Sequence, residues 1–225
     1  MMREHYHEEL ESITDGLVEM ANLVGSAIGR ATTALLDADL HLAENVISGD
    51  EKVDDLQRDL EERAITLLAR QQPVATDLRI VVTSLRMSAD LERSGDLAHH
   101  VARLARLRYP GHAIPRDLRR TILEMGQLAQ RLMAQAAEVL TTHDVDAALQ
   151  LDKDDDRMDE LHRTIFQHLM DEQWHHGVET AVDATLVGRY YERFADHAVA
   201  VARHVVFLVT GQHADDLLTE PPTTT

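Results

Sequence analysis

The chain has 225 residues, of which 44% are hydrophobic and only 4% aromatic, so it can bury a core, and that core must be aliphatic. The absence of cysteine excludes disulfides, thiolate zinc sites and cysteine nucleophiles. A formal net charge of −18 argues against direct nucleic-acid binding, which relies on Lys and Arg meeting phosphates. Neither a signal peptide nor a run of about 18 apolar residues is present, so we expect a cytoplasmic protein that does not span a membrane.

The first half of the chain predicts three long helices. Apolar residues that recur at three- and four-residue steps place them at about residues 8–39, 41–71 (or only from 50) and 76–108. Pro73 cannot continue the second helix, and Thr76 can cap the third. Gly25 and Gly29 form a G-x-x-x-G, for which close packing of soluble helices is the favoured interpretation.

The second half repeats this plan after a Pro/Gly cluster at residues 109–115. Its helices are expected at about residues 116–141, 145–174 and 179–210, with Thr142 or Asp144 as a cap and Gly211 at the last C-terminus. Residues 213–225 are expected to form a disordered tail. The predicted fold class is therefore all-α, with about six long helices in two tandem three-helix bundles at residues 5–109 and 112–212.

An internal repeat supports this division. Leu91–Arg103 reads L-E-R-S-G-D-L-A-H-H-V-A-R, and Tyr191–Arg203 reads Y-E-R-F-A-D-H-A-V-A-V-A-R, with 7 of the 13 positions identical. Chance matching would give about one identity. A repeat at a fixed offset that covers half the chain indicates a duplicated domain. Each copy contains Glu-x-x-x-Asp, which places both carboxylates on one face of a helix.

A second pair of carboxylates precedes each of these motifs. Asp50 and Asp54 are four residues apart on the second expected helix, and Asp152 and Asp156 on the fifth. In an antiparallel hairpin, residues equidistant from the turn lie at the same height. The pairs 50/96 and 54/92 are centred on residue 73, and the pairs 152/196 and 156/192 on residue 174. The expected clusters are Asp50, Asp54, Glu92 and Asp96 in the first half, and Asp152, Asp156, Glu192 and Asp196 in the second.

Four converging carboxylates would repel one another, and a bound cation would offset that repulsion. Carboxylate oxygens suit Mg²⁺, Mn²⁺, Ca²⁺ or iron, and a nitrogen ligand from His99 or His197 would admit zinc. Glu192 and Asp196 lie opposite the apolar stripe of their helix and so should face outward. The alternative is a solvated acidic face with no ligand. Arg93 is expected to neutralise the carboxylates beside it, although binding of an anion or a partner is the other interpretation.

Three segments resemble the PhoU family of phosphate-specific transport accessory proteins: R-Q-Q-P-V-A-T-D-L-R, L-E-R-S-G-D and R-Y-Y-E-R-F-A-D-H-A. The resemblance implies two three-helix bundles with metal ions (Fe, Zn, Mn or Mg) on the surface at the eight carboxylates named above. It also implies a cytoplasmic, dimeric regulator that restrains the phosphate-starvation response by contacting the Pst phosphate importer and a PhoR-type sensor histidine kinase. Residues 173–177 lack the Gln-Pro signature of the first turn, so the second half matches the family pattern less closely.

Two other classes of protein compete with this interpretation. A ferritin-like di-metal oxidase would need Glu-x-x-His on two helices. Asp96 and His99 offer one carboxylate-x-x-His, but the second copy has Val199 at the histidine position. A helical scaffold without metal is the other alternative. Since no Gly-rich phosphate loop and no Ser/His/Asp set stands out, we do not expect an enzyme.

Overall fold

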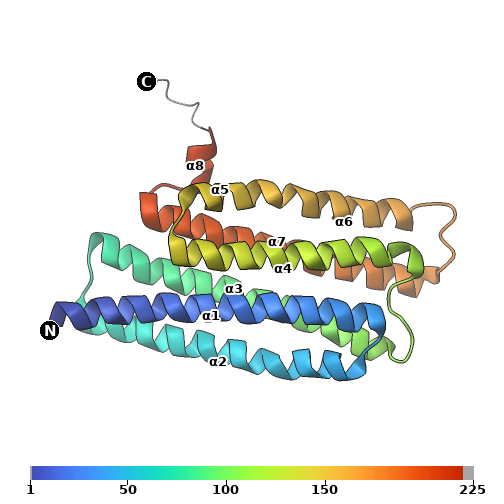
Figure 1. Ribbon diagram of the computed structural model, residues 1–225, viewed down its shortest axis with the longest axis horizontal. Helices are drawn as coiled ribbons and strands as arrows, with labels where there is room; N and C mark the ends of the chain where they lie inside the picture. Colours follow the sequence, from blue (N-terminus) through green and yellow to red (C-terminus); the bar gives the residue numbers. More distant parts are fainter. Residues whose placement is uncertain (1, 220–225) are drawn as a thin grey trace.

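The computed structural model describes the chain from residue 2 to residue 219, and this part contains helices and no strand (Figure 1). The long helices of the first half are α1 (Met2–Asp37), α2 (Leu40–Gln71) and α3 (Ala75–Arg108). Those of the second half are α4 (Arg116–Thr142), α5 (Val145–Asp154), α6 (Asp156–Leu169) and α7 (Gly177–Thr210), followed by the short α8 (Ala214–Thr219). The predicted all-α class is confirmed.

The halves expected at residues 5–109 and 112–212 correspond to α1–α3 and α4–α7, and they lie side by side. Across the junction α1 packs against α4 and α3 packs against α7. Figure 1 shows α2 and the α5–α6 pair at opposite outer edges of the molecule. Each outer helix therefore forms an antiparallel pair with α3 or α7, which is the arrangement that the carboxylate argument requires.

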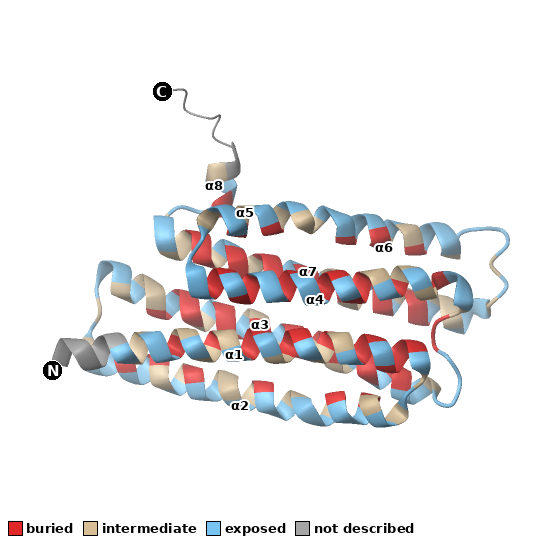
Figure 2. Cartoon of the chain, in the orientation of Figure 1, coloured by how far each residue is buried: buried red, intermediate tan, exposed pale blue. Residues whose placement is uncertain are grey.

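The core is aliphatic, as the composition predicts, and buried residues line the faces that the helices turn toward one another (Figure 2). Tyr191 and Phe194 are the largest fully buried side chains. The Thr32 hydroxyl donates to the carbonyl of Ile28 at 2.7 Å, so Tyr191 must donate the 2.7 Å hydrogen bond that joins the two hydroxyls. This bond links α1 of one half to α7 of the other.

Small residues allow the two halves to approach closely. Gly25 and Gly29 of α1 face Met133 and Gln130 of α4, where an added Cβ would lie 3.4 and 2.8 Å from side-chain atoms. Gly126 of α4 lies still closer to Thr32, with only 2.3 Å between an added Cβ and the hydroxyl oxygen. The G-x-x-x-G therefore serves the packing of two helices, as expected.

The structure supports the earlier of the two predicted starts of α2, and it differs from the prediction in two other details. α2 is continuous from Leu40, where the Asp39 carboxylate caps the amide of Leu42 at 2.9 Å. Thr76 does not cap α3, because that helix already begins at Ala75 after an extended Val74. The fifth expected helix is broken at Asp155, within a run of aspartates whose helix propensity is low and whose charges repel.

The C-terminal segment is the other correction. Residues 213–225 were predicted to be disordered, but Ala214–Thr219 forms α8 and Ala214 is buried. Residues 220–225 lie outside the described part of the chain. Asp144 and Gly211 cap their helices as predicted. No helix between residues 2 and 219 combines the length and the apolar character that crossing a membrane requires.

Candidate metal centre

The first carboxylate cluster lies where α2 and α3 pack together. Asp50 and Asp54 project from α2, Glu92 and Asp96 from α3, and all four are partly buried. Gly95 allows this close approach, because an added Cβ would lie 3.1 Å from Oδ1 of Asp50. The predicted meeting of these two helices at this height is therefore found.

The charges in this cluster are coupled. Burial raises the pKa of Asp50; the hydrogen bond from His99 opposes that rise, while the charges of Asp54 and Asp96 add to it. Burial, followed by the charge of Asp96, also raises the pKa of Glu92. Both carboxylates therefore hold a proton more readily than free ones do. A bound cation would compete for the same oxygens.

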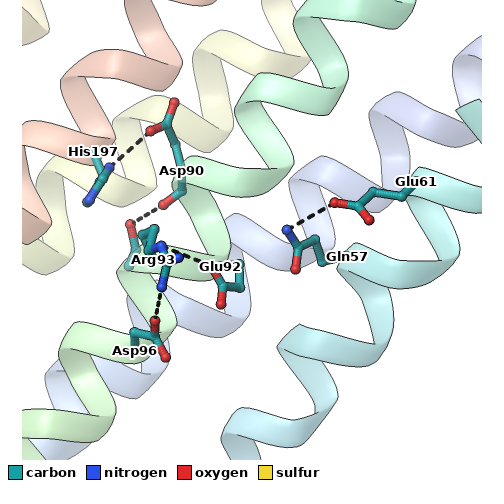
Figure 3. Close-up of polar contacts among 8 residues, drawn as sticks. Gln57, Glu61, Asp90, Glu92, Arg93, Asp96 and His197 are labelled. Carbon is teal, nitrogen blue, oxygen red and sulfur yellow. Dashed lines mark hydrogen bonds and ion pairs between the residues drawn. The ribbon is translucent and has the colours of Figure 1, made fainter.

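Basic side chains balance part of this negative charge. Nδ1 of His99 lies 2.6 Å from Oδ2 of Asp50. Arg93 lies between Glu92 and Asp96, with Nη1 2.8 Å from Oδ2 of Asp96 (Figure 3). Arg93 thus neutralises its neighbours, as expected. Within the described part of the chain, no three His, Asp or Glu side chains are arranged closely enough to hold an ion as they stand. Coordination would require side chains such as Asp96 to turn from their present partners.

The second cluster includes Asp155, which spacing from the turn does not predict. Oδ1 of Asp155 is buried and has no hydrogen-bond partner among the described residues. Burial, followed by the charges of Asp196 and Asp159, raises the pKa of Asp155 to about 7. Asp152 instead accepts a 2.7 Å hydrogen bond from Nε of Arg203, which lies about two helical turns beyond Asp196 on α7. Glu192 is paired with Arg189 on its own helix.

Spacing from the turn predicts Asp152 and Asp156, whereas a buried apolar residue in each half supports a different alignment of α6 with α2. Val53 precedes Asp54 and is 3% exposed, and Met158 precedes Asp159 and is 0% exposed. Aligning these two core residues places Asp155 and Asp159 where the first half has Asp50 and Asp54. Asp152 and Asp156 stand three residues earlier. The pattern Asp-x-x-apolar-Asp was thus available in the sequence as a signal for this pair.

His197 does not face the second cluster. Its Nδ1 lies 3.0 Å from Oδ1 of Asp90 on α3 (Figure 3), and Nε2 of His204 lies 3.3 Å from the other oxygen of that carboxylate. Burial alone would raise the pKa of Asp90, but these two histidines hold it below its ordinary value. Asp90, His197 and His204 therefore connect the two halves of the protein. Of the two histidines considered as metal ligands, His99 is the one that contacts a cluster.

Comparison with known proteins identifies the family. The family model of the PhoU domain matches the sequence twice, at residues 17–105 and 122–205. The chain belongs to the PhoU family. Both repeats found in the sequence are therefore PhoU domains, and each contains one of the two carboxylate clusters.

Named PhoU proteins match along almost their whole length. The phosphate-specific transport system accessory protein PhoU homolog 2 of Mycobacterium tuberculosis is 52% identical over 210 residues, which cover 93% of this chain and 99% of the relative. PhoU homolog 1 of Mycobacterium leprae is 50% identical over 215 residues, covering 96% and 97%. The crystal structure of PhoU from Pseudomonas aeruginosa superposes with a TM-score of 0.84 at 30% identity, and covers 92% of this chain and 100% of that one.

Proposed function

We propose that this protein is the accessory protein of a phosphate-specific transport system, which represses the phosphate-starvation response and moderates phosphate uptake when phosphate is plentiful. The observation that carries this proposal is the 52% identity, over 93% of the chain, to a protein named as an accessory protein of the phosphate-specific transport system. A rigid helical protein of this kind would act as an adaptor that favours one state of its partner. We infer no catalytic role and place the protein in the cytoplasm.

Phosphate uptake tests the transport part of this proposal. Cells that lack the protein should take up radiolabelled phosphate faster than wild-type cells in phosphate-rich medium, because the importer is no longer restrained. Expression of the protein from a plasmid should restore the lower rate. An uptake rate that deletion leaves unchanged, in a strain without a second PhoU protein, contradicts the role in transport.

We also propose that both carboxylate clusters bind metal ions, of iron, zinc, manganese or magnesium. The raised pKa values of Asp50, Glu92 and Asp155 support this, since a cation would relieve the same crowding of charge that a proton relieves. The buried oxygen of Asp155 that has no partner supports it further. The first site would comprise Asp50, Asp54, Glu92 and Asp96, and the second Asp155, Asp159, Glu192 and Asp196. When bound, the ion would supply positive charge that fixes these side chains.

The two registers of the second site are separable by metal analysis of purified variants. We expect the double change Asp155→Asn/Asp159→Asn to lower the metal-to-protein ratio, and Asp152→Asn/Asp156→Asn to leave it nearer that of the wild type. Asp55 and Asp59 provide the matched control on α2, because each is exposed and paired with an arginine. Equal metal content in all of these proteins contradicts the site.

For partners we propose a second copy of the chain, the ATPase subunit of the Pst importer and a PhoR-type sensor kinase. An exposed apolar groove at the end of the α6–α7 hairpin supports a docking role, with a volume of about 760 Å³. Met170 and Val178 there are 81% and 82% exposed. Substitution of both by Ser should abolish co-purification with a partner while the circular dichroism of the protein stays unchanged.

The two alternative classes are tested separately. In a ferritin-like oxidase the carboxylates project into the interior of a four-helix bundle, whereas here they lie along the outer edge of α3 and α7 beside α2 and α6. Oxygen consumption with Fe²⁺ that disappears in the Glu92→Gln variant would favour the oxidase. Purified protein without stoichiometric metal, but with normal regulation, would favour the metal-free scaffold.

A further inference from the structure

A groove between the C-terminal part of α3 and the N-terminal part of α7 is lined by two arginines that form no ion pair within the described part of the chain. It has a volume of about 600 Å³. The side chains that give it its character are His100, Arg103, Arg106, Leu107, Leu186 and Tyr190. Both helices belong to the junction of the two halves (Figure 1), and none of the carboxylates assigned to the two clusters lines the groove. The groove is thus distinct from the carboxylate clusters.

The two arginines of this groove are unpaired. Arg103 and Arg106 are exposed, and neither guanidinium forms an ion pair or a hydrogen bond with any residue that the structure describes. Their spacing of three residues places them on the same side of α3. Both guanidinium groups therefore face solvent on one side of α3, in a chain whose net charge is −18.

The aromatic wall of the groove adds a third basic group. The ring of His100 stacks on that of Tyr190 with 5.3 Å between centroids and an angle of 23° between planes. Asp183 is the acidic residue that lines the groove, and Arg108 engages it through Nε at 2.6 Å and Nη2 at 3.0 Å while also pairing with Glu179. Both of these carboxylates are directed at Arg108, so neither forms an ion pair with Arg103 or Arg106.

In the other repeat, the region equivalent to this groove has carboxylate partners that the groove lacks. An offset of 100 residues relates Arg103 to Arg203 and Tyr190 to Asp90. Arg203 is held by Asp152, and Asp90 accepts hydrogen bonds from two histidines. At that end of the α3–α7 junction each of these basic side chains has a carboxylate partner. The groove has a tyrosine at the position of that aspartate, so its positive charge faces solvent.

We propose that this groove binds the phosphoryl group of a small molecule, either free phosphate or a phosphate monoester. Two guanidinium groups and an imidazole suit a group that carries close to two negative charges at neutral pH better than they suit a single carboxylate. Leu107, Leu186 and the ring of Tyr190 would contact an organic part, and the volume is that of small-molecule sites. The inference rests on the groove alone and stands independently of the proposed regulatory role.

Isothermal titration of the purified full-length protein tests this site at low ionic strength, with inorganic phosphate and with adenosine monophosphate (AMP) as probes. Adenosine and succinate are the uncharged and carboxylate controls. The Arg103→Gln/Arg106→Gln protein should bind either phosphate probe at least about tenfold more weakly, because both charge-assisted contacts are lost. Arg86→Gln/Arg131→Gln removes the same charge from exposed positions outside the groove and should bind as the wild type does.

The relative affinities identify the source of the phosphoryl group. AMP binding that is tighter than phosphate binding supports a monoester, and equal affinity supports free phosphate. The proposal is overturned if neither probe binds, or if both arginine variants bind as the wild type does. Succinate that binds as tightly as phosphate, or adenosine that binds as tightly as AMP, also overturns it. Unchanged thermal denaturation of the double variant excludes misfolding as the cause of a loss.

Discussion

Asp155 should destabilise the metal-free protein at neutral pH, and its replacement by Asn should remove that effect. The pKa of this carboxyl group rises from 3.8 in the unfolded chain to about 7 in the folded protein. The folded state therefore binds more protons between these values, and its stability falls as pH rises through that window. Below about pH 4 both states are protonated and Asp155 costs nothing.

The size of the effect follows from the shift. One pKa unit corresponds to about 1.4 kcal/mol, so the full shift would be worth about 4 kcal/mol. Asp155 is only partly buried, and solvent screening reduces this to about 2 kcal/mol. Asp155→Asn should therefore unfold at about the same urea concentration as the wild type at pH 4, but be about 2 kcal/mol more stable at pH 8.

Urea denaturation in the presence of a chelator measures this difference. Asp156→Asn is the matched control, because it removes an exposed charge from the adjacent position. A bound divalent cation should reverse the order, since saturating the wild type at a hundred times its Kd adds about 2.7 kcal/mol of stability. A stability difference that is the same at pH 4 and pH 8, or an Asn variant that is less stable at pH 8, would refute the argument.

Three further predictions concern the junction of the two halves, each measured by urea or thermal denaturation. Tyr191→Phe should cost about 1 kcal/mol, because the buried Thr32 oxygen loses its donor; a cost of zero contradicts the hydrogen bond. Gly126→Ala should cost about 1–3 kcal/mol, because the new methyl group meets Thr32 at 2.3 Å; unchanged stability would mean that the helices separate freely. Arg108→Gln should lower the melting temperature more than Arg108→Gln with Asp183→Asn, since the single change leaves a buried carboxylate unpaired; equal losses would count against the pair.

The helices and their pairing could be predicted from the sequence, because each signal was either local or repeated in both halves. Pro73 marks the first hairpin turn, and Gly211, in a left-handed conformation, ends α7. The repeat of Glu-x-x-x-Asp pointed to a duplicated domain, and the family comparison bears this out. Equidistance from Pro73 then placed α2 and α3 in the correct register without any structural information.

The second cluster was harder to predict, because equidistance from a turn fixes height only to within about one helical turn. Asp152 and Asp155 are three residues apart and share a side of their helix, so both satisfy that condition. The break at Asp155 also shifts the register within the hairpin. Burial of Met158 favours Asp155, and burial depends on tertiary packing.

Contacts between the halves left no pattern in the sequence. Asp90 meets His197 and His204 across more than a hundred residues, and no periodicity connects these positions. The position of His197 next to Asp196 suggests a metal ligand, whereas its contact with Asp90 is visible only in the structure. Such pairs depend on how one bundle is placed on the other.

We propose above all that this PhoU-family protein represses the phosphate-starvation response through a surface that metal ions at its carboxylate clusters would support. The most direct measurement is the expression of a phosphate-responsive reporter gene in phosphate-rich medium, in a host strain from which the protein has been deleted. We predict that the reporter is on in this strain, that the wild-type gene switches it off, and that a gene with Asp50→Asn, Asp54→Asn and Asp155→Asn only partly does so at equal protein level. A reporter that stays off after deletion, in a strain without another PhoU protein, would contradict the account.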